Sequence, residues 1–386
     1  MMNLEVLVSQ IKSWGTELGF QDIAITDGDL EAYSSYLEKW LENGYHAQMH
    51  YMTRNQEKRL HPHLLHPQTC RVITARMDYL PTGTSPPEVL RQKDKAYIAR
   101  YALGRDYHKL IRKRLAKLAE KINQEIQEST NANDGNSSHY RAFSDSAPVF
   151  EKALAEKAGL GWIGKNTLLM TRESGSWFFL GEIFTNLPLP LTSPTADKTV
   201  PATNHCGACK ACIKICPTNA LVGPNQLDAS LCISYLTIEN PAGIPTELRE
   251  KMGNRIFGCD DCQIICPWNR YAKHTQEKDF SPRHNLDNED LLSLFSWNKE
   301  TFLTHTEGSA IRRIKHWQWQ RNLAVALGNG SYSIKTIALL RTRLAELGQA
   351  GQDEIDSAAT AILMEHIQWA INRLVEKNAP DKPATP

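Results

Sequence analysis

Two cysteine runs in the middle of the 386-residue chain constrain its fold more than any other feature. The first, CGACKACIKICP at 206–217, spaces its cysteines by two, two and three residues and ends in Cys-Pro. The second, CDDCQIICP at 259–267, has the same ending but only three cysteines. In bacterial ferredoxins the run C-x2-C-x2-C-x3-C-P holds two [4Fe-4S] clusters, and its fourth cysteine ligates the other cluster. The spacing therefore predicts a compact double-cluster module.

The second run lacks its first cysteine, because Ile256 stands at that position. We infer that Cys232, the remaining thiol nearby, completes the set. The ferredoxin crossover then divides the ligands into two groups. One cluster is expected on Cys206, Cys209, Cys212 and Cys266, and the other on Cys216, Cys232, Cys259 and Cys262. The ninth cysteine, Cys70, is expected to be a small buried hydrophobe.

Structural zinc is the alternative interpretation of the cysteines. Zinc sites typically use two separated C-x2-C pairs for one ion, which two runs ending in Cys-Pro match poorly. A disulfide framework is not expected, because the N-terminus MMNLEVLVSQIKSWG has no secretory signal and the protein is expected in the cytoplasm, where thiols stay reduced. No stretch approaches the roughly 18 uncharged apolar residues of a membrane span, so no membrane partner is expected.

Periodicity predicts mixed α/β and α+β architecture in three parts. Residues 1–190 alternate between helical and strand patterns, with a helix at 4–20 and strands at 21–27, 70–80 and 176–184. This part is expected to be an α/β domain with a polar surface loop at 127–140. A proline- and threonine-rich linker follows at 187–205.

The other two parts are the cysteine module and a helical tail. Residues 191–280 are expected to form a ferredoxin-like domain. Residues 281–386 are expected to be all-α, and RNLAVALGN resembles the second-helix pattern of HEAT-like repeats. The predicted helices of this part cover 291–297, 309–329, 334–347 and 357–377.

Basic charge is concentrated locally, although the net charge is only +1. Residues 91–121 hold eleven Lys/Arg against three acids, and a predicted apolar helix face runs through Ile111, Leu115, Leu118 and Ile122. Residues 307–346 hold seven Lys/Arg against two acids, with Arg312, Arg313, Lys315 and Arg321 near Trp317 and Trp319. Basic residues among aromatics suit phosphates and unstacked bases of RNA, although a charge run is more often a solvated helix face.

Two motifs come close to known binding patterns. GLGWIGKN at 159–166 has Asn166 where a phosphate-binding loop needs Ser or Thr, and it follows a helical rather than a strand pattern. Asp106-Tyr107-His108 begins like the D-x-H-x-x-G of some cobalamin enzymes, but Ile111 replaces the glycine. We therefore expect neither nucleotide hydrolysis nor a histidine ligand to cobalt.

Over nearly its whole length the chain resembles the bacterial epoxyqueuosine reductase family. The resemblance is carried by YALGRDYHKL, SDSAPVFEKALAEKAGLGWIGKN, the eight cysteines, CISYLTIE, MGNRIFGCDDCQIICPWNRY and EGSAIRRIKH. It implies reduction of epoxyqueuosine to queuosine at the wobble position of tRNA, with loss of the epoxide oxygen as water. It also implies a cobalamin in the N-terminal domain that receives electrons from the two clusters, and a HEAT-like part that contacts tRNA. We expect a monomer served by a flavodoxin or ferredoxin system.

The resemblance also implies roles for single residues. Asp145 stands at the family's proton-donor position, and this role requires burial that keeps the carboxyl protonated; the alternative is a helix N-cap. The candidate cobalamin contacts are Arg54, Asp145, Lys165, Asn166, Ser234 and Asp260. The candidates for tRNA are Arg312, Arg313 and Lys315 on the backbone and Tyr235 and Arg255 near the flipped-out base.

Two other functions compete with this interpretation. A reductive dehalogenase-like cobalamin enzyme would combine the same cofactors but act on halogenated small molecules. A ferredoxin-type electron carrier would hold the clusters without cobalt. The basic segments and the helical tail argue against the dehalogenase-like enzyme, and corrinoid content and activity on tRNA would distinguish the electron carrier.

Overall fold

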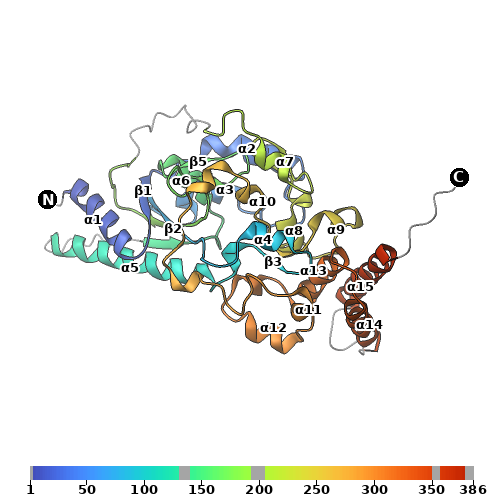
Figure 1. Ribbon diagram of the computed structural model, residues 1–386. Coiled ribbons are helices and arrows are strands. Elements are labelled where there is room, and N and C mark those ends of the chain that lie inside the picture. The colour runs from blue at the N-terminus through green and yellow to red at the C-terminus, as the bar shows by residue number, and fades with distance from the viewer. Residues whose placement is uncertain (1–2, 130–139, 193–204, 350–356, 379–386) are drawn as a thin grey trace.

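The computed structural model describes residues 3–129, 140–192, 205–349 and 357–378 (Figure 1). A four-stranded antiparallel sheet organises the N-terminal part, in the order β1 (Asp22–Thr26), β2 (Arg71–Asp78), β7 (Phe178–Thr185) and β4 (Tyr140–Phe143). The first three strands were predicted; β4 was missed because it adjoins a polar run. Most of the predicted loop at 127–140 and linker at 187–205 lies outside the described residues.

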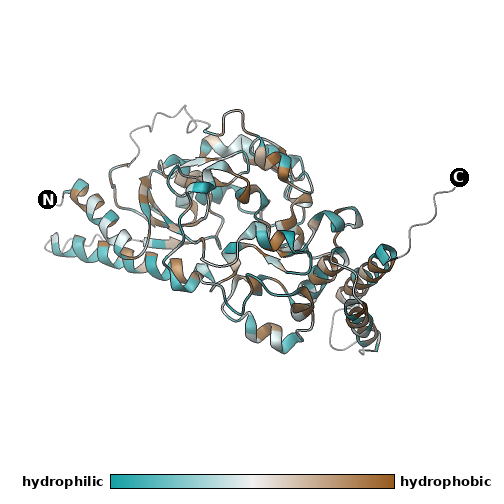
Figure 2. Ribbon diagram, viewed as in Figure 1, coloured by the Kyte–Doolittle hydropathy of each residue, from teal (hydrophilic) through white to brown (hydrophobic). Residues whose placement is uncertain are grey.

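Helices cover both faces of this sheet. α1 (Leu4–Glu17) and α5 (Tyr107–Ser129) pack on one face, and α6 (Glu151–Lys157) packs on the other. The predicted apolar face of α5 is confirmed, since Ile111, Leu115, Leu118 and Ile122 are fully buried. Most of the remaining α5 surface is hydrophilic (Figure 2). The predicted amphipathic pattern therefore fixes how α5 lies on the sheet.

The two faces of the sheet differ in polarity. Strand side chains alternate between faces, so Phe179 and Ile183 of β7 join the α1 and α5 side, whereas Phe178 and Leu180 point toward α6. Glu182 falls in the row that faces α6 and is fully buried. The side of the sheet that faces α6 therefore contains a buried carboxyl group.

The rest of the N-terminal part consists of short elements. They are α2 (Ser34–Glu42), α3 (Gln56–Leu60), α4 (Pro86–Arg91), β3 (Tyr97–Ile98) and the hairpin of β5 (Trp162–Ile163) with β6 (Leu169–Met170). Within the described residues, no helix is both long and apolar enough to cross a bilayer. Cys70, expected to be buried, is half-buried just before β2.

The cysteine module is built from short helices joined by loops. It contains α7 (Ala211–Ile215), the hairpin β8 (Leu221–Gly223) and β9 (Gln226–Leu227), α8 (Ile233–Ile238), α9 (Thr246–Met252), β10 (Arg255–Phe257) and α10 (Asp261–Ile264). β10 pairs in parallel with β3 of the N-terminal part. The predicted boundary near residue 190 therefore does not separate two independent sets of strands.

The C-terminal part is helical, as predicted, and packs directly on the cysteine module. Its helices are α11 (Leu291–Phe295), α12 (Lys299–His305), α13 (His316–Asn329), α14 (Ile334–Gln349) and α15 (Ser357–Asn378). One continuous core joins these helices to Ala96, Ile98 and Leu103 and to Ile256 and Phe257 of β10. The HEAT-like repeat remains a prediction.

Side chains of α13 anchor this contact. Arg321, expected on a basic surface, is fully buried and donates to the backbone oxygens of Leu236, Asn240 and Ala242. Burial lowers the pKa of Arg321 to about 9. Trp319, expected beside it on the surface, is also fully buried. The sequence pattern misled here because α13 is enclosed on nearly all sides, so its polar residues satisfy backbone carbonyls instead of solvent.

We expect Arg321→Ala to lower the free energy of unfolding by about 3–5 kcal/mol, because it removes the guanidinium donor from three buried carbonyl oxygens, although Gln318 still donates to that of Asn240. Urea unfolding followed by circular dichroism measures the loss. Arg341→Ala is the matched control, since Arg341 is exposed on α14 and should change stability by less than about 0.5 kcal/mol. Equal stability of the two variants would contradict the anchoring role.

Candidate metal centre and acid site

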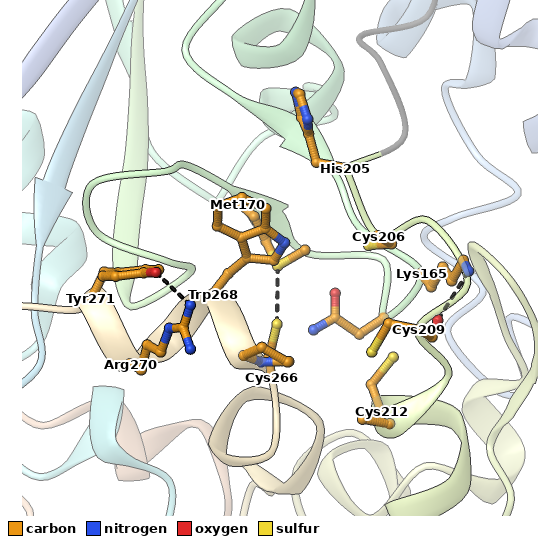
Figure 3. A pocket seen from close by; sticks show the side chains of 13 residues that line it. Lys165, Met170, His205, Cys206, Cys209, Cys212, Cys266, Trp268, Arg270 and Tyr271 are labelled. Atoms are coloured by element: carbon orange, nitrogen blue, oxygen red, sulfur yellow. Dashed lines mark hydrogen bonds between the residues drawn. The ribbon is translucent and has the colours of Figure 1, made fainter.

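Four of the predicted ligands line one cavity. Cys206, Cys209, Cys212 and Cys266 surround a space of about 260 Å³, together with Met170 and other residues from the hairpin β5–β6. Their sulfur atoms lie around this space in Figure 3. Three of these cysteines come from the first run and the fourth from the end of the second run. The fold therefore brings together the crossover group that the spacing predicted.

The other cysteines gather next to the first group. Burial raises the pKa of the Cys262 thiol, and the neighbouring thiols of Cys232, Cys212 and Cys216 raise it further. Cys259 and Cys232 pack against the same hydrophobic cluster. Among the described residues, no three His, Cys, Asp or Glu side chains converge on one point where a single metal ion could be held. Raised thiol pKa values mean that iron binding must displace protons.

Two of the predicted cofactor contacts hold the cysteine loops. Lys165 is buried, and its ammonium donates to the backbone oxygens of Gly207 and Cys209, the latter at 2.9 Å. Asn166 is buried and donates to the backbone oxygen of Cys262 at 3.3 Å. The GKN sequence of the near-miss phosphate loop thus ties the N-terminal domain to both cysteine groups.

The other predicted cofactor contacts differ in how accessible they are. Asp260 is 2% exposed and accepts hydrogen bonds from the Tyr97 hydroxyl at 2.7 Å and the Arg100 backbone N–H at 2.8 Å. This engagement gives Asp260 a role in joining the N-terminal part to the cysteine module. Ser234 is half-buried and Arg54 is exposed. Of these three, Arg54 and Ser234 have side chains that a ligand could reach.

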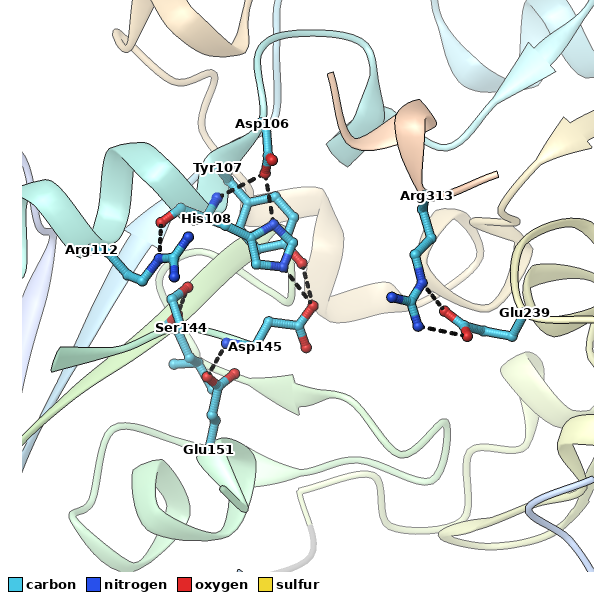
Figure 4. A network of polar contacts seen from close by, with 10 residues as sticks. Asp106, Tyr107, His108, Arg112, Ser144, Asp145, Glu151, Glu239 and Arg313 are labelled. Carbon is cyan, nitrogen blue, oxygen red and sulfur yellow. Dashed lines mark hydrogen bonds and ion pairs between the residues drawn. The ribbon is translucent and has the colours of Figure 1, made fainter. Parts of the chain in front are cut away.

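Asp145 lies at the centre of a network of polar contacts (Figure 4). One carboxylate oxygen, Oδ2, accepts the Tyr107 hydroxyl at 2.6 Å and lies 3.2 Å from Nε2 of His108. The other ring nitrogen of His108, Nδ1, lies 2.6 Å from Asp106. Tyr107 and His108 open α5, so the helix start presents both side chains to Asp145. Both nitrogens of His108 are engaged within the protein.

The side chain of Asp145 is not buried in the way that the predicted proton-donor role requires. Its side chain is 59% exposed, and the hydrogen bond from His108 is the main reason that its pKa is lowered. Asp145 is also not the N-cap of α6, because Phe150 occupies that position. The backbone at Asp145 has a φ of +57°, which a non-glycine residue adopts only where the surroundings hold it.

Glu151, which is half-buried, and Glu182, which is fully buried, form a pair of neighbouring carboxyl groups next to the Asp145 loop. Glu151 accepts the backbone N–H of Asp145, and the hydroxyl of Ser144 donates to the backbone oxygen of Leu180 at 3.2 Å. Burial, and then the charge of Asp145, raises the pKa of Glu151 to about 7. Burial, and then the charge of Glu151, raises the pKa of Glu182 well above its usual value. No sequence pattern predicted this pair of carboxyl groups.

The basic candidates for RNA fall into two groups. Arg312, Arg313 and Lys315 are exposed, and Arg313 forms two 2.9 Å hydrogen bonds to Glu239 across from Asp145 (Figure 4). Tyr235 and Arg255 are not open to the surface. Tyr235 is 7% exposed and its hydroxyl accepts the Gln48 backbone N–H. The Arg255 side chain is 13% exposed and lies 2.7 Å from Asp261, so both have internal roles.

A mixed α/β domain joined to a module of eight clustered cysteines is typical of an iron–sulfur protein. Residues 205–269 match the family model "4Fe-4S double cluster binding domain", and residues 59–146 match "Epoxyqueuosine reductase QueG, DUF1730". The epoxyqueuosine reductase of Pseudomonas aeruginosa is 52% identical over 95% of this chain and 94% of its own. The chain belongs to the epoxyqueuosine reductase family.

Solved structures agree with this assignment. The chain is similar to an epoxyqueuosine reductase bound to an epoxyqueuosine-modified tRNA stem loop, with a TM-score of 0.78 and 25% identity over 97% of this chain and all of that one. It is also similar to the Bacillus subtilis enzyme with an aspartate-bearing catalytic loop swung out of the active site, with a TM-score of 0.79 and 27% identity over 96% and 91% of the two chains.

Proposed function

We propose that the chain reduces epoxyqueuosine to queuosine at the wobble position of tRNA. The observation that carries the proposal is an open acid, Asp145, within a chain that contains a double-cluster domain and shares 52% identity with an epoxyqueuosine reductase. The basic segments and the relative bound to a modified tRNA stem loop support an RNA substrate. The reaction removes the epoxide oxygen as water and leaves a carbon–carbon double bond.

The eight clustered cysteines would hold two [4Fe-4S] clusters in the crossover arrangement. Cys206, Cys209, Cys212 and Cys266 would hold the cluster in the cavity of Figure 3. Cys216, Cys232, Cys259 and Cys262 would hold the other. Lys165 and Asn166 would fix the loops of both groups, because each donates to a backbone oxygen within them. A flavodoxin or ferredoxin system would supply the electrons, and the protein would act as a monomer.

Cobalamin would bind on the open side of Asp145. The fit rests on Tyr51, a large aromatic side chain that is 45% exposed. Burial of its hydroxyl and the nearby charge of Glu239 raise the pKa of Tyr51 to about 12, and Arg313 and Asp145 are also among its electrostatic neighbours. An exposed ring among charged groups offers a surface for a flat cofactor, and Arg54 would reach its polar edge. When bound, cobalamin supplies the reduced metal that acts on the epoxide carbon.

Asp145 would protonate the departing epoxide oxygen. General acid catalysis by a positioned side chain contributes about 10²–10⁴ to a rate. The carboxylate is held by Tyr107 and His108 and supported through its backbone by Glu151, so its direction is fixed before substrate binds. Substrate and cofactor would cover the exposed carboxyl and exclude water from it.

The exposed cations Arg312 and Lys315 would contact phosphates of the anticodon stem loop. We expect the double variant Arg312→Ala, Lys315→Ala to bind the stem loop more weakly and to reduce the slope of log K against log salt by about 1 to 2, since each phosphate contact releases counterions. Fluorescence anisotropy over a salt series measures both. Lys12→Ala, an exposed cation on α1, is the control. An unchanged salt slope in the double variant would exclude these two contacts.

Nucleoside mass spectrometry tests the function directly. The reconstituted, chemically reduced protein is incubated with tRNA that carries epoxyqueuosine, and queuosine is expected to replace it. Persistence of epoxyqueuosine would reject the proposal. Dehalogenation of a halogenated aromatic without turnover of tRNA would favour the dehalogenase-like alternative, and cluster reduction with neither activity would favour an electron carrier.

A further inference from the structure

The proposed reduction needs two protons at the same oxygen atom. Converting an epoxide to an alkene and water breaks two carbon–oxygen bonds, forms the second carbon–carbon bond and consumes two electrons and two protons. The reductant that serves the clusters supplies the electrons. A single carboxylic acid such as Asp145 releases one proton. The site must therefore contain a second proton source or reload Asp145 during turnover.

The groups around Asp145 differ in their ability to release a proton. Those within hydrogen-bond or electrostatic reach are His108, Tyr107, Glu151, Glu182, Lys152, Arg313, Tyr51 and Tyr101. Tyr107 stays protonated, because burial raises its pKa well above its usual value. Arg313 keeps its proton because Glu239 raises its pKa further. Glu151 meets the backbone N–H of Asp145 rather than its carboxylate.

His108 is the group in contact with the Asp145 carboxylate that can deliver a proton. Its Nε2 lies 3.2 Å from Oδ2 of Asp145, and its Nδ1 lies 2.6 Å from Asp106. The carboxylate of Asp106 fixes the ring and stabilises a positive charge on it. The His108 side chain is 25% exposed, which leaves a route for recharging from solvent.

We propose that His108, held by Asp106, is a catalytic proton relay that delivers protons through Oδ2 of Asp145 to the departing oxygen. This inference rests on the proposed function and gives a role to His108, which the sequence analysis considered only as a ligand to cobalt and excluded as one. The Asp106–His108–Asp145 chain holds the first proton that the reaction consumes and, after solvent recharges His108, passes the second by the same contacts.

The charge state of the network agrees with this role. Partial burial opposes the charged ring, but hydrogen bonds to Asp106 and Asp145 raise the pKa of His108 to about 9. The same contact lowers the pKa of Asp145. At neutral pH the resting site therefore holds an imidazolium beside a carboxylate, and the labile proton resides on His108. Asp145 becomes an acid when that proton moves to Oδ2.

Each step balances. As the first carbon–oxygen bond breaks, its electron pair goes to the oxygen, which takes the proton that Oδ2 of Asp145 has received from His108 Nε2 and becomes a hydroxyl group. The carbon that loses the oxygen takes up the two electrons from the external reductant. Solvent then reprotonates His108. The electron pair on that carbon forms the second carbon–carbon bond as the other carbon–oxygen bond breaks, and the hydroxyl takes a second proton by the same path and leaves as water.

The pH dependence of single turnover tests the relay. With wild-type protein carrying its cofactors and tRNA that contains epoxyqueuosine, we expect a rate that is constant from about pH 7 and falls near pH 9, because His108 loses its proton there. In His108→Gln the rate should fall by about 10²-fold at neutral pH. The rate of His108→Gln should then rise with proton concentration across the whole pH range, since protons must come from water.

Added imidazole distinguishes a relay from a structural role. We expect imidazole to raise the rate of His108→Gln by at least about 10-fold and to leave the wild-type rate unchanged. His274→Gln, which alters an exposed histidine outside the network, is the matched control and should behave as wild type. A wild-type rate in His108→Gln, or a slow rate that imidazole does not restore, would overturn the relay. Absence of turnover by wild type would instead reject the proposed function.

Histidine NMR gives a readout that does not depend on turnover. In protein carrying its clusters, the His108 ring is expected to titrate near pH 9 and to titrate at lower pH in Asp106→Asn, which keeps the imidazole but removes one of the two carboxylates beside it. The pH at which the single-turnover rate of Asp106→Asn falls on the alkaline side should be lower than in wild type by a similar amount. A His108 titration that is the same in both proteins would contradict the proposed arrangement.

Discussion

Replacing Cys206 and Cys216 together is expected to remove all cluster iron, although both residues belong to the same sequence run. In the crossover arrangement the two cysteines serve different clusters. Iron per chain should therefore fall from about eight atoms to nearly none in the Cys206→Ala, Cys216→Ala double variant. Turnover of epoxyqueuosine in tRNA should be lost with it.

A second pair of substitutions sharpens this experiment. Cys206→Ala, Cys266→Ala removes two ligands that line the same cavity, so about four iron atoms should remain. Cys70→Ala is the control and should keep about eight, because Cys70 lies in the N-terminal domain before β2. Iron analysis and electronic absorption of anaerobically prepared protein measure the outcome. Loss of only four atoms from the first double variant would exclude the crossover, and zinc in place of iron would exclude the clusters.

Asp145→Asn is expected to slow single turnover by about 10²–10⁴-fold, because the amide cannot release a proton to the departing oxygen. The substitution keeps the size of the side chain and its hydrogen bond with Tyr107, so the loop should stay in place. Rapid quenching followed by nucleoside mass spectrometry measures the rate.

The control for this prediction is Asp290→Asn, which alters an exposed carboxylate paired with Lys95 at 3.0 Å and outside the Asp145 network. Both variants should contain as much iron as wild type. A wild-type rate in Asp145→Asn would exclude Asp145 as the proton donor, whatever the fate of His108.

Local patterns in the sequence predicted the elements that depend on neighbouring residues. The apolar face of α5 follows from residues three and four apart, and the strands of the sheet follow from short apolar runs. The cysteine spacing predicted which thiols lie together, because ferredoxin-like loops are compact. Within the described residues, α11, α14 and α15 end within two residues of their predicted limits, whereas α13 begins at His316 rather than at residue 309, and α12 was not predicted.

Contacts between distant segments could not be predicted in this way. His108 and Asp145 are 37 residues apart and belong to different elements, so no local pattern links them. The parallel pairing of β3 with β10 joins residues 97 and 255. The burial of Arg321 could not be predicted for the same reason, because its partners lie some 80 residues earlier in the chain. The contacts of Lys165 and Asn166 with the cysteine loops also join distant segments, and their role toward cobalamin stays a prediction.

The shared core of β3, β10 and the C-terminal helices has a consequence for engineering. A fragment limited to the cysteine module would lose the strand partner of β10 and the buried donors Arg321 and Asn322, and would expose Ile256 and Phe257 to water. The electron-carrying part of this chain is thus not a portable unit that could be grafted onto another enzyme. Transplanting it would require the flanking segments on both sides as well.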